Sequence, residues 1–98
     1  MRCLKIPTAV ASLVRGLHPD LKRKVRAALD QILEDPSVGK ALKEEMAGLR
    51  SYRVGRIRVI YRSAAGDVIE LVAVGPRSTI YEETLRLVKK QARVTRTG

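Results

Sequence analysis

The residues best suited to chemistry in this chain are arginines, and two of them face each other across a predicted hairpin. Apolar and polar residues alternate on both sides of Gly55-Arg56, which indicates two half-buried strands joined by a two-residue type II′ turn. This register places Arg53 directly opposite Arg58, and no acidic residue occurs over residues 46–66 to compensate their charge. Like charges directly opposite each other on paired strands destabilise a hairpin by roughly a few tenths of a kcal/mol. A bound polyanion would relieve this repulsion, so the pair favours a polyanion-binding face. The alternative is two long side chains extended into water.

Other site chemistries find little support in the composition. The single cysteine, Cys3, excludes an internal disulfide and a cysteine-built zinc site, and it fits a reducing cytoplasm. The single histidine, His18, lies between two predicted helices and before a proline, where a capping or surface role is favoured over acid–base chemistry. With the acidic residues scattered, we expect no metal site and no cofactor. No apolar run approaches membrane-spanning length and no signal-peptide core is present, so we expect no membrane partner.

The net charge of +10 is unevenly distributed. Residues 19–49 carry six acidic and six basic residues, whereas residues 50–98 carry eleven basic and four acidic ones. The excess charge therefore belongs mainly to the hairpin half and the C-terminal end, as expected of a nucleic-acid-binding surface. Only three aromatic residues occur, all tyrosines, which argues against a broad base-stacking platform.

The elements that position the arginines form a predicted α+β fold. A short strand over residues 2–6 precedes a helical hairpin, whose helices span residues 9–16, capped by Thr8 and ended by Gly16, and residues 19–35, opened by Pro19. A short helix over residues 39–47 then leads into a three-stranded antiparallel meander. The core side of its hairpin carries Tyr52, Val54, Ile57, Val59 and Tyr61.

The third strand of the meander, over residues 68–74, is almost wholly apolar and is predicted to lie near the sheet centre, buried on both faces. The capping-box pattern Thr79-x-x-Glu82 opens a last helix to about Gln91. We expect the helices to cover one sheet face and to leave the face with Arg53 and Arg58 open. Residues 1–92 form one domain, and residues 93–98 form a basic, frayed tail.

Three motifs occur in order and at a specific spacing. They are Leu49-x-x-Tyr52-Arg53-Val54-Gly55-x-Ile57-Arg58-Val59-Ile60-Tyr61, then Val72-Ala73-Val74-Gly75-Pro76-Arg77, then Ile80-Tyr81. Together they resemble the RelE/ParE superfamily, the small toxins of bacterial and archaeal type II toxin–antitoxin pairs, over most of residues 1–91. RelE-like members cleave mRNA in the ribosomal A site, and ParE-like members poison DNA gyrase.

The resemblance implies roles for individual residues. Arg58 matches a strand arginine that stabilises charge at the scissile phosphate, Arg77 matches a second catalytic arginine, and Tyr81 matches a C-terminal catalytic tyrosine. The pair Arg77 and Tyr81 favours the RNA-cleaving branch. RelE-like toxins also place two basic residues on the preceding strand; Arg53 fits one of these positions, but Ser51 occupies the other. The identity of the general base is therefore open.

The implied reaction is a metal-independent cleavage in which the 2′-hydroxyl of RNA attacks the adjacent phosphate. Arg58 and Arg77 can stabilise the growing charge as planar forks matched to phosphate oxygens, and Tyr81 is the best candidate for proton transfer. The ribosome would contribute by positioning the mRNA. Further RNA or ribosome contacts are expected from Arg50, Arg56, Arg62, Lys89, Lys90 and Arg93.

The implied partners are the ribosome with its mRNA and a cognate antitoxin that forms a hetero-oligomer with the toxin in the cytoplasm. Two other functions stay open at this point. One is a ParE-like DNA gyrase inhibitor without chemistry of its own. The other is a catalytically inactive antitoxin-binding module that acts in operon repression.

Overall fold

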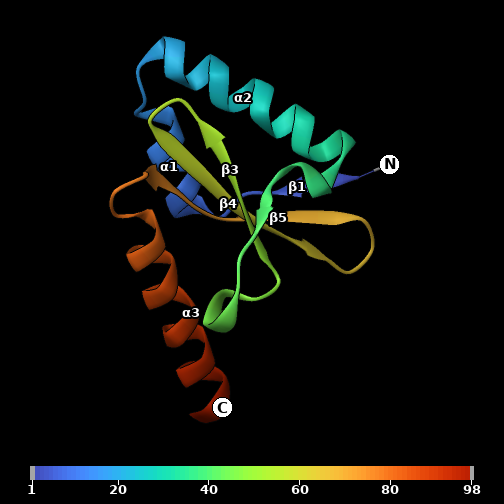
Figure 1. Cartoon of the computed structure of the whole chain (residues 1–98), viewed down its shortest axis with the longest axis vertical. Coiled ribbons are helices and arrows are strands. Elements are labelled where there is room, and N and C mark those ends of the chain that lie inside the picture. Colours follow the sequence, from blue (N-terminus) through green and yellow to red (C-terminus); the bar gives the residue numbers. More distant parts are fainter. Residues whose placement is uncertain (1, 98) are drawn as a thin grey trace.

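A five-stranded sheet organises the chain (Figure 1). The computed structural model describes residues 2–97, with side chains described for residues 2–90. The α+β class is confirmed, but the sheet is larger than the predicted meander because two short strands join it, in the order β1-β5-β4-β3-β2. The elements are β1 (Cys3–Lys5), α1 (Thr8–Arg15), α2 (Pro19–Glu34), the 3₁₀ helix η1 (Pro36–Val38), β2 (Lys40–Ala41), the 3₁₀ helix η2 (Glu44–Met46), β3 (Leu49–Val54), β4 (Ile57–Ala64), β5 (Val68–Pro76) and α3 (Ile80–Thr97).

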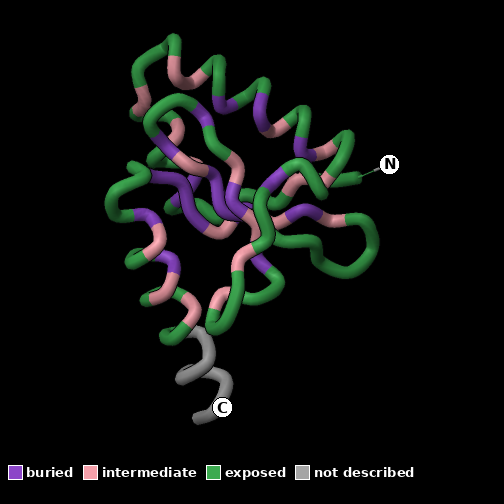
Figure 2. Tube along the Cα trace, in the orientation of Figure 1, coloured by how far each residue is buried: buried purple, intermediate pink, exposed green. Residues whose placement is uncertain are grey.

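The predicted helical hairpin is confirmed as α1 and α2. Gly16 ends α1 and Pro19 opens α2, as the sequence indicated, but Thr8 makes no capping hydrogen bond, because α1 begins at Thr8 itself and Pro7 is the residue before it. The inner sides of both helices pack on one face of the sheet, and the buried positions form an apolar stripe along α2 (Figure 2). The buried residues of α1 and α2 are Val10, Val25, Ala28 and Ile32.

The β3–β4 hairpin has the predicted register. Val54 pairs with Ile57 around the two-residue turn, and Arg53 lies opposite Arg58. Gly55 takes the first turn position with a φ of +61°, a conformation that glycine adopts without steric cost. The alternation therefore sends one set of side chains to the α1–α2 face and the other set, including both arginines, to the opposite face.

A β-bulge in β5 explains its continuous apolar run. Ile60 pairs with Ala73 and Tyr61 pairs with Leu71, so Val72 is an extra residue that opposes no partner. The bulge reverses the alternation beyond it. As a result Leu71 and Val74 both reach the core under α1 and α2, whereas Ala73 belongs to a second cluster on the opposite face. The predicted position near the sheet centre is confirmed, since β5 lies between β1 and β4.

The second face of the sheet is covered by α3, contrary to the prediction that all helices lie on one side. Ile80 is fully buried against Leu49, Ile60 and Ala73, and Val88 packs at the margin of this cluster. The helix continues to Thr97 instead of ending near Gln91. The division into a domain over residues 1–92 and a tail over residues 93–98 stays a prediction.

The helix predicted over residues 39–47 is wrong, because this segment forms β2 and η2 instead. The buried Tyr61 hydroxyl donates to the carbonyl oxygen of Pro36 at 2.6 Å and accepts from the Gly39 amide at 2.9 Å. A side chain at Gly39 would clash with the Tyr61 ring. A long-range contact thus fixes the extended backbone here, and this contact leaves no periodic signal in the sequence.

Candidate functional site

Three polar side chains meet between the hairpin and α3. The Ser51 Oγ on β3 lies 3.1 Å from the Tyr81 hydroxyl on the first turn of α3, and the Arg58 Nη1 on β4 donates to the same Ser51 Oγ at 3.2 Å. Ser51 is buried, while Arg58 and Tyr81 are half-buried. The Ser51 hydroxyl has one hydrogen and two lone pairs, so it can accept from Arg58 and either donate to or accept from Tyr81. The arrangement is a hydrogen-bond chain from guanidinium to phenol.

The charge of Arg58 is partly desolvated and lacks a counterion among the side chains of residues 2–90. Its Nε is buried without a hydrogen-bond partner there. The guanidinium carbon lies 5.9 Å from the centroid of the Tyr81 ring, within the range of a cation–π interaction. An uncompensated, desolvated cation costs folding free energy and strengthens attraction for an anion.

Arg77 lies in a neighbouring hollow that also contains Arg53 and Arg56. This tip hollow, of about 610 Å³, is lined by Arg53, Gly55, Arg56, Pro76, Arg77 and Ser78. The Arg77 amide donates to the carbonyl oxygen of Arg56 at 3.2 Å, which ties the loop after β5 to the hairpin turn. Arg53 connects the two groups, since it lines the hollow and is the cross-strand neighbour of Arg58.

The other predicted contact residues are dispersed. Arg50 lies on β3 beside Tyr61, where its Nη1 donates to the Gly39 carbonyl oxygen at 2.8 Å, so it faces away from Arg58. Arg62 pairs with Glu70, its Nε lying 2.7 Å from the carboxylate. Lys89 and Lys90 are exposed on α3. The side chain of Arg93 lies outside the described residues.

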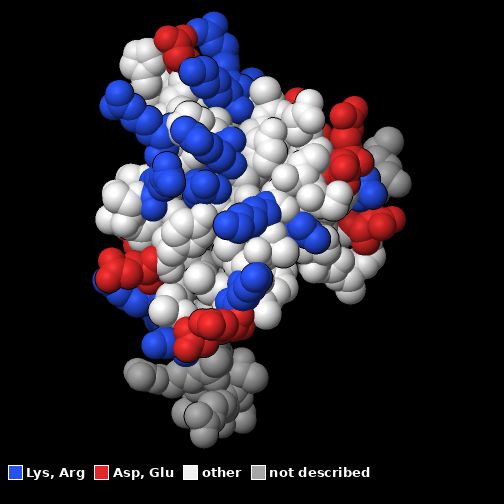
Figure 3. All heavy atoms as spheres, in the orientation of Figure 1, with Lys and Arg blue, Asp and Glu red and all other residues white. Residues whose placement is uncertain are grey.

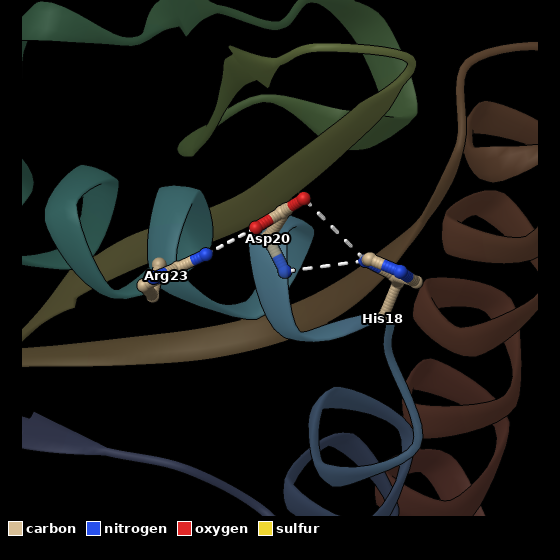
Figure 4. A network of polar contacts seen from close by, with 3 residues as sticks. All are labelled: His18, Asp20 and Arg23. Carbon is tan, nitrogen blue, oxygen red and sulfur yellow. Dashed lines mark hydrogen bonds and ion pairs between the residues drawn. The ribbon is translucent and has the colours of Figure 1, made fainter.

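His18 is a helix cap, as the sequence predicted. Its Nδ1 accepts from the Asp20 amide at 3.3 Å at the start of α2, and Asp20 in turn binds Arg23 (Figure 4). The three side chains are exposed and lie apart from the hairpin site. Within the described part of the chain, no group of three His, Cys, Asp or Glu residues is arranged to hold a metal ion.

Ser51 is the residue whose role the sequence did not predict. The resemblance to RelE-like toxins marked residue 51 only as a position where a basic residue is absent. Its position opposite Ile60, on the same strand face as Arg53, was nevertheless predicted, and α3 brings Tyr81 onto that face. A prediction that placed α3 over this face would have identified the contact.

Comparisons with known proteins identify the class to which this fold belongs. The family model described as the ParE toxin of the type II toxin-antitoxin system parDE matches residues 10–81. The chain therefore belongs to this family within the RelE/ParE superfamily, and it is a toxin of the type II toxin–antitoxin class. The resemblance drawn from the sequence motifs is confirmed. No curated protein sequence matches the chain.

Several solved structures share the fold. The toxin–antitoxin complex RelBE2 of Mycobacterium tuberculosis matches with 26% identity and a TM-score of 0.69, covering 78% of this chain and 98% of the other. The archaeal RelE–RelB complex of Pyrococcus horikoshii matches with 26% identity and a TM-score of 0.64, covering 78% and 94%. A variant of E. coli RelE in the free state, at 16% identity, has a TM-score of 0.73 and covers 92% and 96%. This last likeness shows the fold alone.

None of the described helices has the length and apolar character needed to span a bilayer.

Proposed function

We propose that the chain is a ribosome-dependent mRNA endoribonuclease whose chemistry takes place at Arg58, Arg77 and Tyr81. The observation that carries the proposal is the contact chain in which Arg58 and Tyr81 share Ser51. A desolvated guanidinium beside a phenol joins a charge stabiliser and a proton-transfer group in one site. The two relatives at 26% identity, both crystallised with an antitoxin, support the RelE-like branch.

In the proposed reaction the RNA 2′-hydroxyl attacks the adjacent phosphorus and the bond to the 5′-oxygen breaks. Arg58 and Arg77 stabilise the charge on the phosphate oxygens, with Arg53 adding to the positive field. Tyr81 delivers its proton to the leaving 5′-oxygen, and the Ser51 hydroxyl donates to the phenol oxygen as it becomes negative. Since arginine stays protonated, the acceptor for the 2′-hydroxyl proton lies on the ribosome or in solvent.

The proposed partner besides the ribosome is a cognate antitoxin. The relatives from M. tuberculosis and P. horikoshii were solved as toxin–antitoxin complexes, and a hetero-oligomer of this kind would keep the present chain inactive. Arg56, Lys89 and Lys90 are exposed basic residues that we assign to ribosomal RNA contacts. Arg50 and Arg62 are assigned structural roles, because both already bind protein groups.

The test is translation of a defined mRNA on purified ribosomes, followed by mapping of the RNA ends. Wild type should cut within the A-site codon, and Arg77→Ala and Tyr81→Phe should each lose most of this cleavage. An Arg26→Ala variant, which removes one exposed charge from the outer side of α2, should cleave like wild type. Absence of ribosomal cleavage by wild type would refute the proposal.

A second function is a gyrase inhibitor, which the match to the ParE model favours. In that case the exposed arginines would bind a protein, and Tyr81 would be a packing residue of α3. Assays of DNA gyrase distinguish the two functions. A gyrase poison produces DNA cleavage complexes, and the Tyr81→Phe variant should still produce them.

A further inference from the structure

A second concave surface continues from the tip hollow towards α2. This helix hollow, of about 330 Å³, lies between α2 and β3, and its lining includes Lys24, Ala28, Gln31, Tyr52 and Arg53. Arg53 lines both hollows. The two hollows are therefore adjacent parts of one surface around a single arginine.

The charge of this surface is positive and uncompensated. No acidic residue lines either hollow, and among the side chains of residues 2–90 no ion pair involves Lys24, Arg53, Arg56 or Arg77. Figure 3 shows lysine and arginine side chains gathered over the tip of the β3–β4 hairpin and the adjoining part of α2, with acidic side chains at the margins. Four unpaired cations along one path attract a polyanion.

The helix hollow is open along one side and contains an aromatic residue. β2 pairs only with Arg50 and Ser51, so residues 52–54 of β3 have no strand on their outer side within the described chain. Tyr52 is half-buried and packs partly against the core, and it lines the hollow together with the small Ala28. A base can stack on a tyrosine ring while a lysine binds the backbone phosphate, and an acidic peptide has no flat face for such a ring.

We infer that single-stranded RNA continues from the proposed cleavage site across Arg53 into the helix hollow, where Lys24 binds a phosphate. The inference rests on the proposed RNA substrate and extends it to a binding segment on α2. The contact with Lys24 lies away from the reacting groups. It therefore contributes to affinity and not to the chemical step.

The experiment is fluorescence anisotropy with a labelled single-stranded RNA of about 12 nucleotides, a length that covers one extended binding site. The RNA carries 2′-O-methyl groups and cannot be cleaved, so binding is measured independently of activity. Lys24→Ala should weaken binding about three- to tenfold at low salt. It should also reduce the slope of log K against log salt by about 0.7, the share of one phosphate contact.

Arg26→Ala is the matched control, because it removes an equal charge from the same helix but lines neither hollow. It should leave the salt slope unchanged. Equal effects of Lys24→Ala and Arg26→Ala would overturn the inference, since they would report only net charge. Unchanged RNA binding by Lys24→Ala would also overturn it, most clearly if the same variant bound its antitoxin more weakly.

The binding result is separable from the proposed function. If wild type cleaves mRNA on ribosomes but Lys24→Ala keeps the full salt slope, the RNA path is wrong and the nuclease stands. If the slope falls as expected but no cleavage occurs, the RNA-binding surface stands and the nuclease fails.

Discussion

The Ser51 Oγ lies 3.1 Å from the Tyr81 hydroxyl and joins β3 to the first turn of α3. The same oxygen accepts a hydrogen bond from Arg58. A buried serine thus sets the position of both groups that we assign to the chemical step. Ser51 occupies the position where the resemblance to RelE-like toxins implied a second basic residue.

Ser51→Ala should lower the rate of ribosome-dependent cleavage about tenfold, equivalent to about 1.4 kcal/mol of lost transition-state stabilisation. The phenol then loses its hydrogen-bond partner, and Arg58 loses its acceptor. Single-turnover kinetics on mRNA-programmed ribosomes measure the change, which should fall on the rate at saturation and not on KM. Ser63→Ala, at an exposed position on β4, is the control. A rate equal to wild type would contradict the positioning role.

Arg58→Met should abolish cleavage while raising the free energy of unfolding by about 1 kcal/mol. The reason is that a half-buried cation without a counterion is costly, and an apolar chain of similar length removes this cost. Urea denaturation measures the stability. Arg53→Met relieves the same repulsion across the hairpin but removes an exposed charge, so it should leave stability nearly unchanged. A large loss of stability in Arg58→Met would show that the arginine is structural.

Tyr61→Phe should destabilise the fold by about 1–3 kcal/mol, because the amide of Gly39 and the carbonyl of Pro36 lose their buried partner. Tyr52→Phe is the matched control, since its hydroxyl makes no hydrogen bond among the described side chains. Burial raises the pKa of the Tyr61 phenol. Stability is therefore full below the unfolded-state value of about 10 and falls as pH rises through the folded-state value. Tyr61→Phe should lack this alkaline decrease.

Asp35→Asn should remove a pH dependence at the acidic end. Hydrogen bonds from the Ser37 hydroxyl and amide lower the pKa of the Asp35 carboxyl. Its stabilising contribution is thus present above the unfolded-state value of about 3.9 and is lost as pH falls through the lowered folded-state value. Thermal unfolding of wild type and Asp35→Asn between about pH 2 and 5 compares the two slopes. Identical slopes would contradict the assignment.

The hairpin was predictable from sequence because its information is local. Alternating residues, a glycine at the turn and the two-residue loop length fix the register, and the structure has Arg53 opposite Arg58 as expected. The coverage by α3 was not predicted. The signal was present, since Ile60 and Ala73 are apolar residues on the face that was taken to be open, and Ile80, Thr84 and Val88 repeat on one side of α3.

Two other features lie beyond local patterns. The backbone around Gly39 depends on hydrogen bonding to Tyr61, far along the chain, and the helix predicted over residues 39–47 failed for this reason. The basic side of α2 was hidden because residues 19–49 sum to zero charge. Four of the six bases in that range occur at residues 22–26, whereas five of its six acids occur at residues 30–45.

The most direct test of the central claim is the single-turnover cleavage rate of an A-site codon by Tyr81→Phe compared with Tyr52→Phe. Each variant removes one phenol oxygen from a half-buried tyrosine. Loss of general acid catalysis should slow Tyr81→Phe at least about 100-fold, with Tyr52→Phe within about twofold of wild type. If both variants cleave at the wild-type rate, Tyr81 transfers no proton and the proposed nuclease site is wrong.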